Sequence, residues 1–263
     1  MTGDAALTDI GEGRPVVFLH GWSVDRSFFA GQHRLVDEGF RVIAPDQAGH
    51  RDGEVAGVLS IADLSTDLAA LLAGLDRPAL LVGWSMGATV ALDHLARRGS
   101  TGIAGLVMVD MTPKVANDVG WRLGLSDGQS LDEAVAAAER MRAGWARYAP
   151  KIADALFAEG RTADAGLVAH ARQVVAARDP AVMAHLWRSL VEADHRDTIR
   201  KLDIPVLALA GARSRLYRPE VAAWIAAQAP RGAAVSIADA GHTPHAEQPE
   251  AFNAALSAFA ARL

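Results

Sequence analysis

Residues 80–89 read LLVGWSMGAT: a short apolar run, the pattern Gly-x-Ser-x-Gly, and the beginning of an amphipathic segment. A serine on such a sharp strand-to-helix turn must adopt a strained backbone conformation, and side chains at positions 83 and 87 would collide with the neighbouring strand or helix. The turn leaves the Ser85 hydroxyl clear of the sheet, at the positive end of the following helix. Because an apolar run precedes the pattern and helical spacing follows it to Arg98, we predict strand, exposed serine and helix here.

Short apolar runs and helical segments alternate on both sides of this turn. The predicted strands are 16–20, 41–44, 103–109, 205–211 and 234–238, with at most one further short strand in 7–10. The predicted helices are 25–38, 61–74, 88–98, 219–228 and 249–263. This alternation predicts an α/β fold with a mostly parallel, doubly wound sheet, in which ligands bind at the carboxyl ends of the strands. His20, Ser85 and Asp110 all follow such ends.

Residues 112–200 contain no strand-like run and are alanine-rich and helical. We interpret them as a helical cap inserted into a core domain made of residues 1–111 and 201–263. We expect aromatic side chains to line a substrate pocket beneath this cap, although core packing explains any single one equally well. The predicted substrate-binding residues are His20, Trp84, Trp121, Trp145 and Trp187.

Composition excludes several classes of protein. The 263-residue chain is 51% hydrophobic, and its formal net charge of −5 leaves no basic face for nucleic acid. It has no cysteine, which excludes disulfides, thiol catalysis and thiolate metal sites. No apolar run approaches the roughly 20 residues of a membrane span, and the N-terminus lacks a signal-peptide core. We expect a cytoplasmic protein that acts on a small molecule, with no cofactor, metal, nucleic-acid or membrane partner; its oligomeric state stays open.

His242 is the candidate general base. A serine hydroxyl is a poor nucleophile at neutral pH and needs a base within hydrogen-bond reach. His242 stands after the last predicted strand and before the last helix, which is where a serine–acid–histidine order brings the histidine back to the serine. The alternative is a surface-loop histidine. We interpret the neighbouring His245 as a cap or rim contact.

The chain resembles the α/β-hydrolase superfamily in three motifs, which are His20-Gly21-Trp22, Gly83-Trp84-Ser85-Met86-Gly87, and Gly241-His242 followed by Glu247-x-Pro249. Within it, the chain is similar to the pimeloyl-carrier-protein methyl ester esterases and to small bacterial carboxylesterases. The resemblance covers nearly the whole chain and implies the fold and a Ser85–His242 pair, but not a substrate. It also implies an oxyanion hole formed by the backbone N–H groups of Trp22 and Met86. We interpret His20 as a brace for that loop.

The triad acid is where the chain departs from the pattern of these relatives. Most of them carry Asp in the turn after the penultimate strand, but here residues 211–217 read GARSRLY, with Ser214 in that position. A histidine without an orienting anion can hold the wrong tautomer. Asp110 ends the strand that follows the helix after Ser85, and some superfamily members place their acid there. We assign Asp110 as the acid; the alternative is that it caps the first cap helix.

These residues predict a serine hydrolase that cleaves a carboxylic ester of a small, largely apolar substrate through an acyl-enzyme intermediate. Rival enzymes on the same fold are a cofactor-free quinolone-type ring-opening dioxygenase, a lactonase and a carbon–carbon bond hydrolase. In the dioxygenase His242 would deprotonate the ring hydroxyl, with Asp110 as its partner. Trp84 is evidence against a dioxygenase, because those dioxygenases carry His directly before the serine of the Gly-x-Ser-x-Gly turn. A ligand receptor that keeps the triad stays open as a non-catalytic alternative.

Overall fold

The computed structural model describes residues 6–51, 57–161 and 163–263 of the chain. In these ranges the strands form one seven-stranded sheet, in the order β1 (Leu7–Ile10), β3 (Phe40–Pro45), β2 (Arg14–Leu19), β4 (Ala79–Trp84), β5 (Ile103–Val109), β6 (Val206–Gly211) and β7 (Gly232–Ile237). β1 pairs antiparallel with β3, and the other neighbouring pairs are parallel. The predicted mostly parallel sheet is confirmed.

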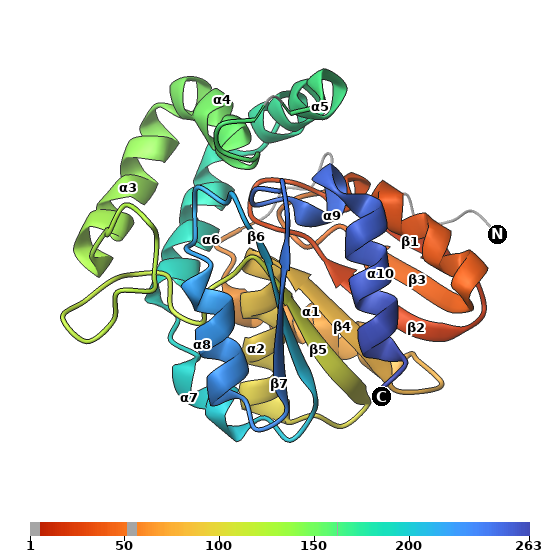
Figure 1. Ribbon diagram of the computed structural model, residues 1–263. Coiled ribbons are helices and arrows are strands. Elements are labelled where there is room, and N and C mark those ends of the chain that lie inside the picture. Colours follow the sequence, from red (N-terminus) through yellow and green to blue (C-terminus); the bar gives the residue numbers. More distant parts are fainter. Residues whose placement is uncertain (1–5, 52–56, 162) are drawn as a thin grey trace.

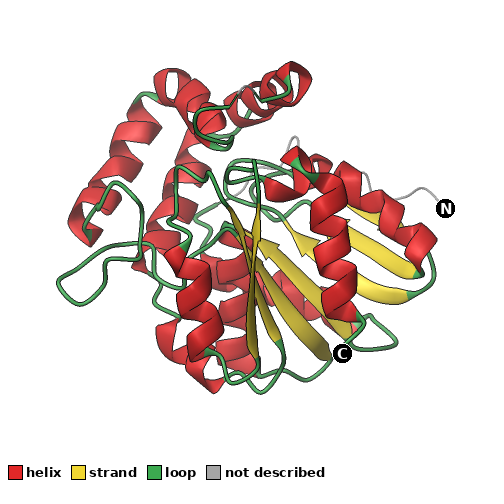
Figure 2. Ribbon diagram, viewed as in Figure 1, coloured by secondary structure: helices red, strands yellow, loops and turns green. Residues whose placement is uncertain are grey.

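Helices cover both faces of this sheet (Figures 1 and 2). One layer contains η1 (Arg26–Glu38), α9 (Pro244–Glu247) and α10 (Pro249–Ala260), which contact one another. The other layer contains α1 (Ile61–Ala73), α2 (Met86–Arg98), α7 (Arg196–Lys201) and α8 (Glu220–Gln228). η1 is a 3₁₀ helix, with the poor α-helix former Gly31 near its middle. No helix in the described ranges is long and apolar enough to cross a membrane.

A group of helices lies above the carboxyl ends of the strands (Figure 1). It contains α3 (Leu131–Ala143), α4 (Trp145–Ala155), α5 (Ala165–Ala176) and α6 (Pro180–Glu192), with α3 packed on α6 and α4 on α5. These helices occupy the chain between β5 and β6, where the sequence predicts a cap. The expected cap range 112–200 also takes in α7, but α7 packs against α2 and α8 beside the sheet. The cap helices therefore end at α6, and α7 belongs to the core layer.

The turn between β4 and α2 has the sharp geometry that its sequence predicts. All six residues of β4 are buried, and Ser85 follows with a φ of 53°, in the left-handed region that few non-glycine residues adopt. A Cβ on Gly87 would lie 2.1 Å from the Leu19 carbonyl oxygen, and one on Gly83 would lie 2.4 Å from the Ala88 nitrogen. Only glycine fits at both places, because the obstructing atoms belong to the backbone.

His245 lies in the core, which corrects its interpretation as a cap or rim contact. Its ring is fully buried, with centroids 4.5 Å from Trp84, 4.9 Å from Phe29 and 5.8 Å from Phe252. Neither ring nitrogen has a hydrogen-bond partner among the described residues. Burial, with a smaller contribution from the charge of His242, lowers the pKa of His245 to about 3. The ring is therefore neutral at physiological pH and behaves as an apolar core group.

This burial predicts an acid-sensitive fold. The stabilising contribution of a neutral buried histidine is complete above its unfolded pKa of about 6.5 and is lost as the pH falls toward the folded value. Between pH 7 and pH 5, protonation of His245 in the unfolded chain should lower the free energy of unfolding by about 2 kcal/mol. His245→Phe keeps a ring in the aromatic cluster and should remove that part of the pH dependence.

Urea unfolding at pH 7, 6 and 5 measures this difference. The exposed His33 offers a matched control, because His33→Gln should leave the pH dependence of wild type unchanged. A His245→Phe variant that folds and still loses stability as steeply as wild type would contradict the prediction.

Candidate active site

Ser85 opens into a small cavity between the sheet and the cap. The cavity has a volume of about 100 Å³, and both Ser85 and His242 line it together with one predicted cap residue, Trp187. The wall is largely apolar; the remaining lining residues are Trp22, Leu125, Ile152, Ala155, Leu156, Leu190, Leu216 and Tyr217. The predicted nucleophile follows β4, the predicted base lies in the loop after β7, and both line the same largely apolar cavity.

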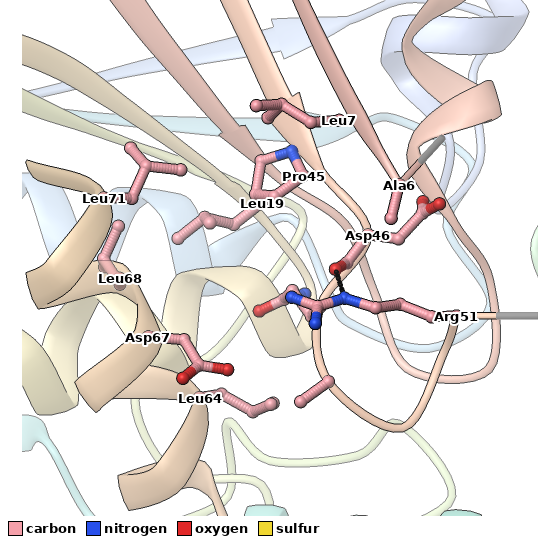
Figure 3. Close-up of a pocket in the computed structure, with 12 residues that line it drawn as sticks. Ala6, Leu7, Leu19, Pro45, Asp46, Arg51, Leu64, Asp67, Leu68 and Leu71 are labelled. Carbon is pink, nitrogen blue, oxygen red and sulfur yellow. Dashed lines mark hydrogen bonds between the residues drawn. The ribbon is translucent and has the colours of Figure 1, made fainter. Parts of the chain in front are cut away.

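A larger cavity, of about 290 Å³, lies elsewhere, between α1 and the β1–β3 side of the sheet (Figure 3). Its described lining contains apolar side chains with Asp46, Gln47, Arg51 and Asp67, but no serine or histidine. The Arg51 side chain extends in among these residues and donates from Nε to the Asp46 carbonyl oxygen at 3.1 Å (Figure 3). The nucleophile and base therefore single out the smaller cavity.

Asp110 and His242 form a buried pair. His242 Nδ1 donates to Asp110 Oδ2 at 2.7 Å, and both side chains are almost completely shielded from solvent. Asp110 directly follows β5, where its own N–H donates to the Leu209 carbonyl at 2.7 Å and its φ is 44°. A carboxylate at Nδ1 selects the tautomer whose Nε2 carries the lone pair that a general base needs.

The turn after β6 supports this acid instead of supplying one. Ser214 Oγ donates to Asp110 Oδ2 at 2.6 Å, and the Gly211 N–H donates to Asp110 Oδ1 at 3.0 Å. With His242, three donors thus hold the carboxylate. The sequence marks position 214 only as the place where an acid is missing, and nothing in its pattern indicates that the serine hydroxyl bonds the acid on the neighbouring strand.

Two further side chains hold the His242 loop. Trp84 Nε1 donates to the His242 carbonyl oxygen at 2.7 Å, so the residue before the nucleophile fixes the loop of the base. The Glu247 carboxylate accepts from the Gly241 N–H at 2.7 Å, from Thr243 Oγ1 at 2.9 Å and from the Ala158 N–H of the cap at 2.9 Å. The Glu-x-Pro motif therefore ties the histidine loop to the cap.

Tyr217 is a cavity residue that the sequence analysis does not select. Its ring centroid lies 5.7 Å from that of His242, and burial, reinforced by the charge of Asp110, raises the pKa of its phenol. The hydroxyl is therefore a neutral group at physiological pH, able to donate a hydrogen bond. An aromatic residue after a strand is too common a pattern to indicate this role.

The two proposed oxyanion donors lie on different elements that meet beside Ser85. Met86 is the first residue of α2, and the first N–H groups of a helix have no acceptor within it. Trp22 lies in the loop after β2, and its indole Nε1 donates to the Met183 carbonyl of α6 at 2.9 Å. Its ring contacts Trp187 and Trp145 with centroid distances of 5.1 and 5.7 Å. The loop after β2 is therefore attached to the cap.

The predicted substrate-binding residues do not all reach the cavity. Trp145 contacts Trp22 but lies behind the lining, with its Nε1 donating to the Val175 carbonyl at 3.1 Å. Trp121 is directed away; it packs on Trp224 at 4.9 Å and donates to the Lys114 carbonyl. For Trp121 and Trp145 these placements favour core packing, which the sequence analysis leaves open as the alternative, and Trp187 is the predicted cap tryptophan in the described lining. Hydrogen bonds from the indoles to backbone carbonyls fix them in the protein interior.

His20 and Trp84 also lie outside the described lining of the cavity, so their assignment as substrate-binding residues stays a prediction without support from this geometry. Trp84 is fully buried and forms part of the core. His20 Nδ1 donates to the Gly21 carbonyl, while its Nε2 accepts the Gln47 N–H at 2.9 Å. Burial lowers the pKa of His20 to about 4, so the ring stays neutral and can accept that bond. This geometry fits a brace for the loop after β2.

Known proteins resemble this chain both in sequence and in fold. A family model described as the alpha/beta hydrolase family matches residues 16–255. The chain is 31% identical to a pimeloyl-[acyl-carrier protein] methyl ester esterase of Methylococcus capsulatus over 89% of each chain, and 28% identical to that of Vibrio cholerae over 96% of each. Among solved structures, a thermophilic esterase from Thermogutta terrifontis is 29% identical, with a TM-score of 0.85, covering 98% of this chain and 93% of its own.

The arrangement around Asp110 predicts how the acid can be removed and replaced. We expect Asp110→Asn to lower kcat/KM for ester hydrolysis by about 10⁴-fold, because the amide favours the wrong tautomer of His242. Ser214→Ala, which removes one hydrogen bond to a charged group, should cost about 10- to 100-fold.

The double variant Asp110→Asn/Ser214→Asp returns a carboxylate to the turn after β6 and should recover at least about 10-fold over Asp110→Asn. Steady-state kinetics on p-nitrophenyl butyrate measure all three variants. Activity of Asp110→Asn within threefold of wild type would refute the assignment of the acid.

Proposed function

The chain belongs to the alpha/beta hydrolase family and is an esterase-like hydrolase, and from this premise we propose that it is a serine esterase. Its substrate is a carboxylic ester with a small, largely apolar acyl group, cleaved through an acyl-enzyme intermediate. The observation that carries the proposal is the 2.7 Å hydrogen bond from His242 to Asp110, on a histidine that shares its cavity with Ser85. The apolar lining supports the choice of acyl group.

The first half of the reaction acylates the enzyme. Ser85 Oγ attacks the ester carbonyl carbon while His242 Nε2 takes its proton. The carbonyl oxygen becomes an oxyanion that accepts hydrogen bonds from the Met86 and Trp22 backbone N–H groups. Asp110 stabilises the imidazolium. His242 then gives the proton to the departing alkoxide, and the alcohol leaves.

The second half releases the acid. Water gives a proton to His242 Nε2 and attacks the acyl carbon, and collapse of the second oxyanion returns the proton to Ser85 Oγ. The relatives named as methyl ester esterases favour methyl esters as a second substrate class for this site. A methoxy leaving group is small, which suits a cavity of about 100 Å³.

The test of the proposal compares wild type with Ser85→Ala on p-nitrophenyl acetate, butyrate and octanoate. We expect wild type to hydrolyse the short esters and Ser85→Ala to lose at least about 10³-fold in kcat, because the nucleophile is gone. A fluorophosphonate should form a phosphonyl ester with Ser85 of wild type, with loss of fluoride and the serine proton, and leave Ser85→Ala unmodified; mass spectrometry detects the phosphonyl group. Ser100→Ala, in the turn before β5, is the matched control and should behave like wild type.

Two results would refute the proposal. Ester hydrolysis that survives Ser85→Ala would assign the turnover to another group. A wild type that neither hydrolyses esters nor reacts with the fluorophosphonate would favour a ligand receptor or the dioxygenase on the same fold.

A further inference from the structure

The loop after β2, residues 20–24, holds a strained residue beside the proposed oxyanion donor; we call it the oxyanion loop. Ser23, which follows Trp22, has a φ of 64°, a conformation that costs energy for any residue with a Cβ. Its N–H donates to His50 Nε2 at 3.1 Å, and its carbonyl accepts from Arg178 Nε at 3.3 Å. Both backbone polar groups of the strained residue are therefore held by side chains from distant parts of the chain.

Arg178 reaches the oxyanion loop from the cap. It stands between α5 and α6 and is buried, with 7% of its surface exposed. Besides the Ser23 carbonyl, its guanidinium donates from Nη1 to the His50 carbonyl and from Nη2 to Asp25 Oδ2, the latter at 2.6 Å. One cap side chain thus joins the oxyanion loop, the N-cap of η1 and the loop that carries His50.

His50 completes the clamp on the other side of Ser23. Burial, followed by smaller contributions from His20 and Arg178, keeps the pKa of His50 well below its usual range. The neutral ring can then donate from Nδ1 to the Ala48 carbonyl and accept the Ser23 N–H at Nε2. Arg178 therefore acts on Ser23 twice, directly through its carbonyl and through the histidine that holds its N–H.

A second hydrogen bond joins the cap to the oxyanion loop, from a residue close to Arg178 in the sequence. The Met183 carbonyl of α6 accepts the Trp22 indole N–H at 2.9 Å. α6 begins at Pro180, and the Asp179 side chain caps it by accepting from the N–H groups of Ala181 and Val182. The hydrogen bonds from Arg178 and Met183 of the cap therefore end on consecutive residues of the oxyanion loop.

We infer that Arg178 is a positioning residue, through which the cap holds the Trp22 N–H in the geometry of the oxyanion hole. The inference rests on the proposed serine esterase function. An oxyanion donor must lie within about 2.7–3.1 Å of the developing charge, and a shift of about 1 Å can cost 10²-fold in rate. Without Arg178, the strained Ser23 loses the donor on its carbonyl, and Trp22 moves with it. The loss falls on the transition state, because the oxyanion exists only there.

Arg178→Met tests this, with Arg172→Met as the matched control. Arg172 lies on α5, and its guanidinium pairs with Asp154 at the surface instead of with the oxyanion loop. We expect Arg178→Met to lower kcat on p-nitrophenyl butyrate about 10- to 100-fold with KM changed less than about threefold. Arg172→Met should keep both constants of wild type.

A trifluoromethyl ketone distinguishes positioning from general damage, since its adduct with Ser85 places an oxyanion in the hole. Its inhibition constant should rise in Arg178→Met by the same factor by which kcat/KM falls. A folded Arg178→Met with wild-type kcat, or with reduced kcat and an unchanged inhibition constant, would overturn the inference.

Two further variants keep the test decisive if Arg178→Met does not fold. Arg178→Met/Asp25→Asn removes the buried charge of Arg178 together with that of its half-buried partner Asp25. Trp22→Phe keeps an aromatic ring but removes the indole N–H that bonds Met183. Each should lower kcat and weaken inhibition by the ketone by matching factors. Wild-type kcat in these variants overturns the inference alone; a wild-type enzyme inert to esters and fluorophosphonate overturns the proposed function with it.

Discussion

The close approach of α2 to the end of β2 is the constraint on which the proposed site depends. A Cβ on Gly87 would lie 2.1 Å from the Leu19 carbonyl oxygen, so glycine alone lets the helix come this near. This contact brings the N-terminus of α2, with Met86, beside the residues that follow β2, which include Trp22. Two N–H groups from separate elements can then face one carbonyl oxygen at Ser85. A larger side chain at position 87 would separate them before any chemistry began.

Strain collects at the ends of the strands, where function needs side chains in unusual directions. Ser23, Ser85, Asp110 and Asp239 are the non-glycine residues with positive φ in the described ranges. Each stands at the carboxyl end of a strand or in the loop just beyond it. Hydrogen bonds offset the strain at Ser23 and Asp110, and ion pairs from Arg213 and Arg161 do so at Asp239. These loops bring Ser85 and His242 to one cavity and place Asp110 at His242 Nδ1, which is the arrangement that the proposed reaction needs.

Local sequence patterns predict most of the fold, but they do not predict the direction of individual side chains. Apolar runs of four to seven residues and the glycines around Ser85 predict the strands and the turn, because burial and close approach leave few residue types. The tryptophans show the limit: Trp84, Trp121 and Trp187 are equally apolar, yet one holds the histidine loop, one packs on Trp224 and one lines the cavity. Which of these an indole does depends on contacts between residues far apart in the chain, and so does the role of Arg178.

The proposed acid, Asp110, follows β5, and the turn after β6 has no carboxylate. The geometry of the sheet explains how an acid in this position can still reach His242. β5 and β6 are adjacent and parallel, so the turns after them open at the same edge of the sheet. Asp110 after β5 and Ser214 after β6 lie within one 2.6 Å hydrogen bond, and His242 Nδ1 reaches the same carboxylate oxygen. A carboxylate on either turn is therefore within reach of the histidine. What must be kept is an anion at Nδ1 with enough donors to hold it, and Ser214 supplies one of these donors.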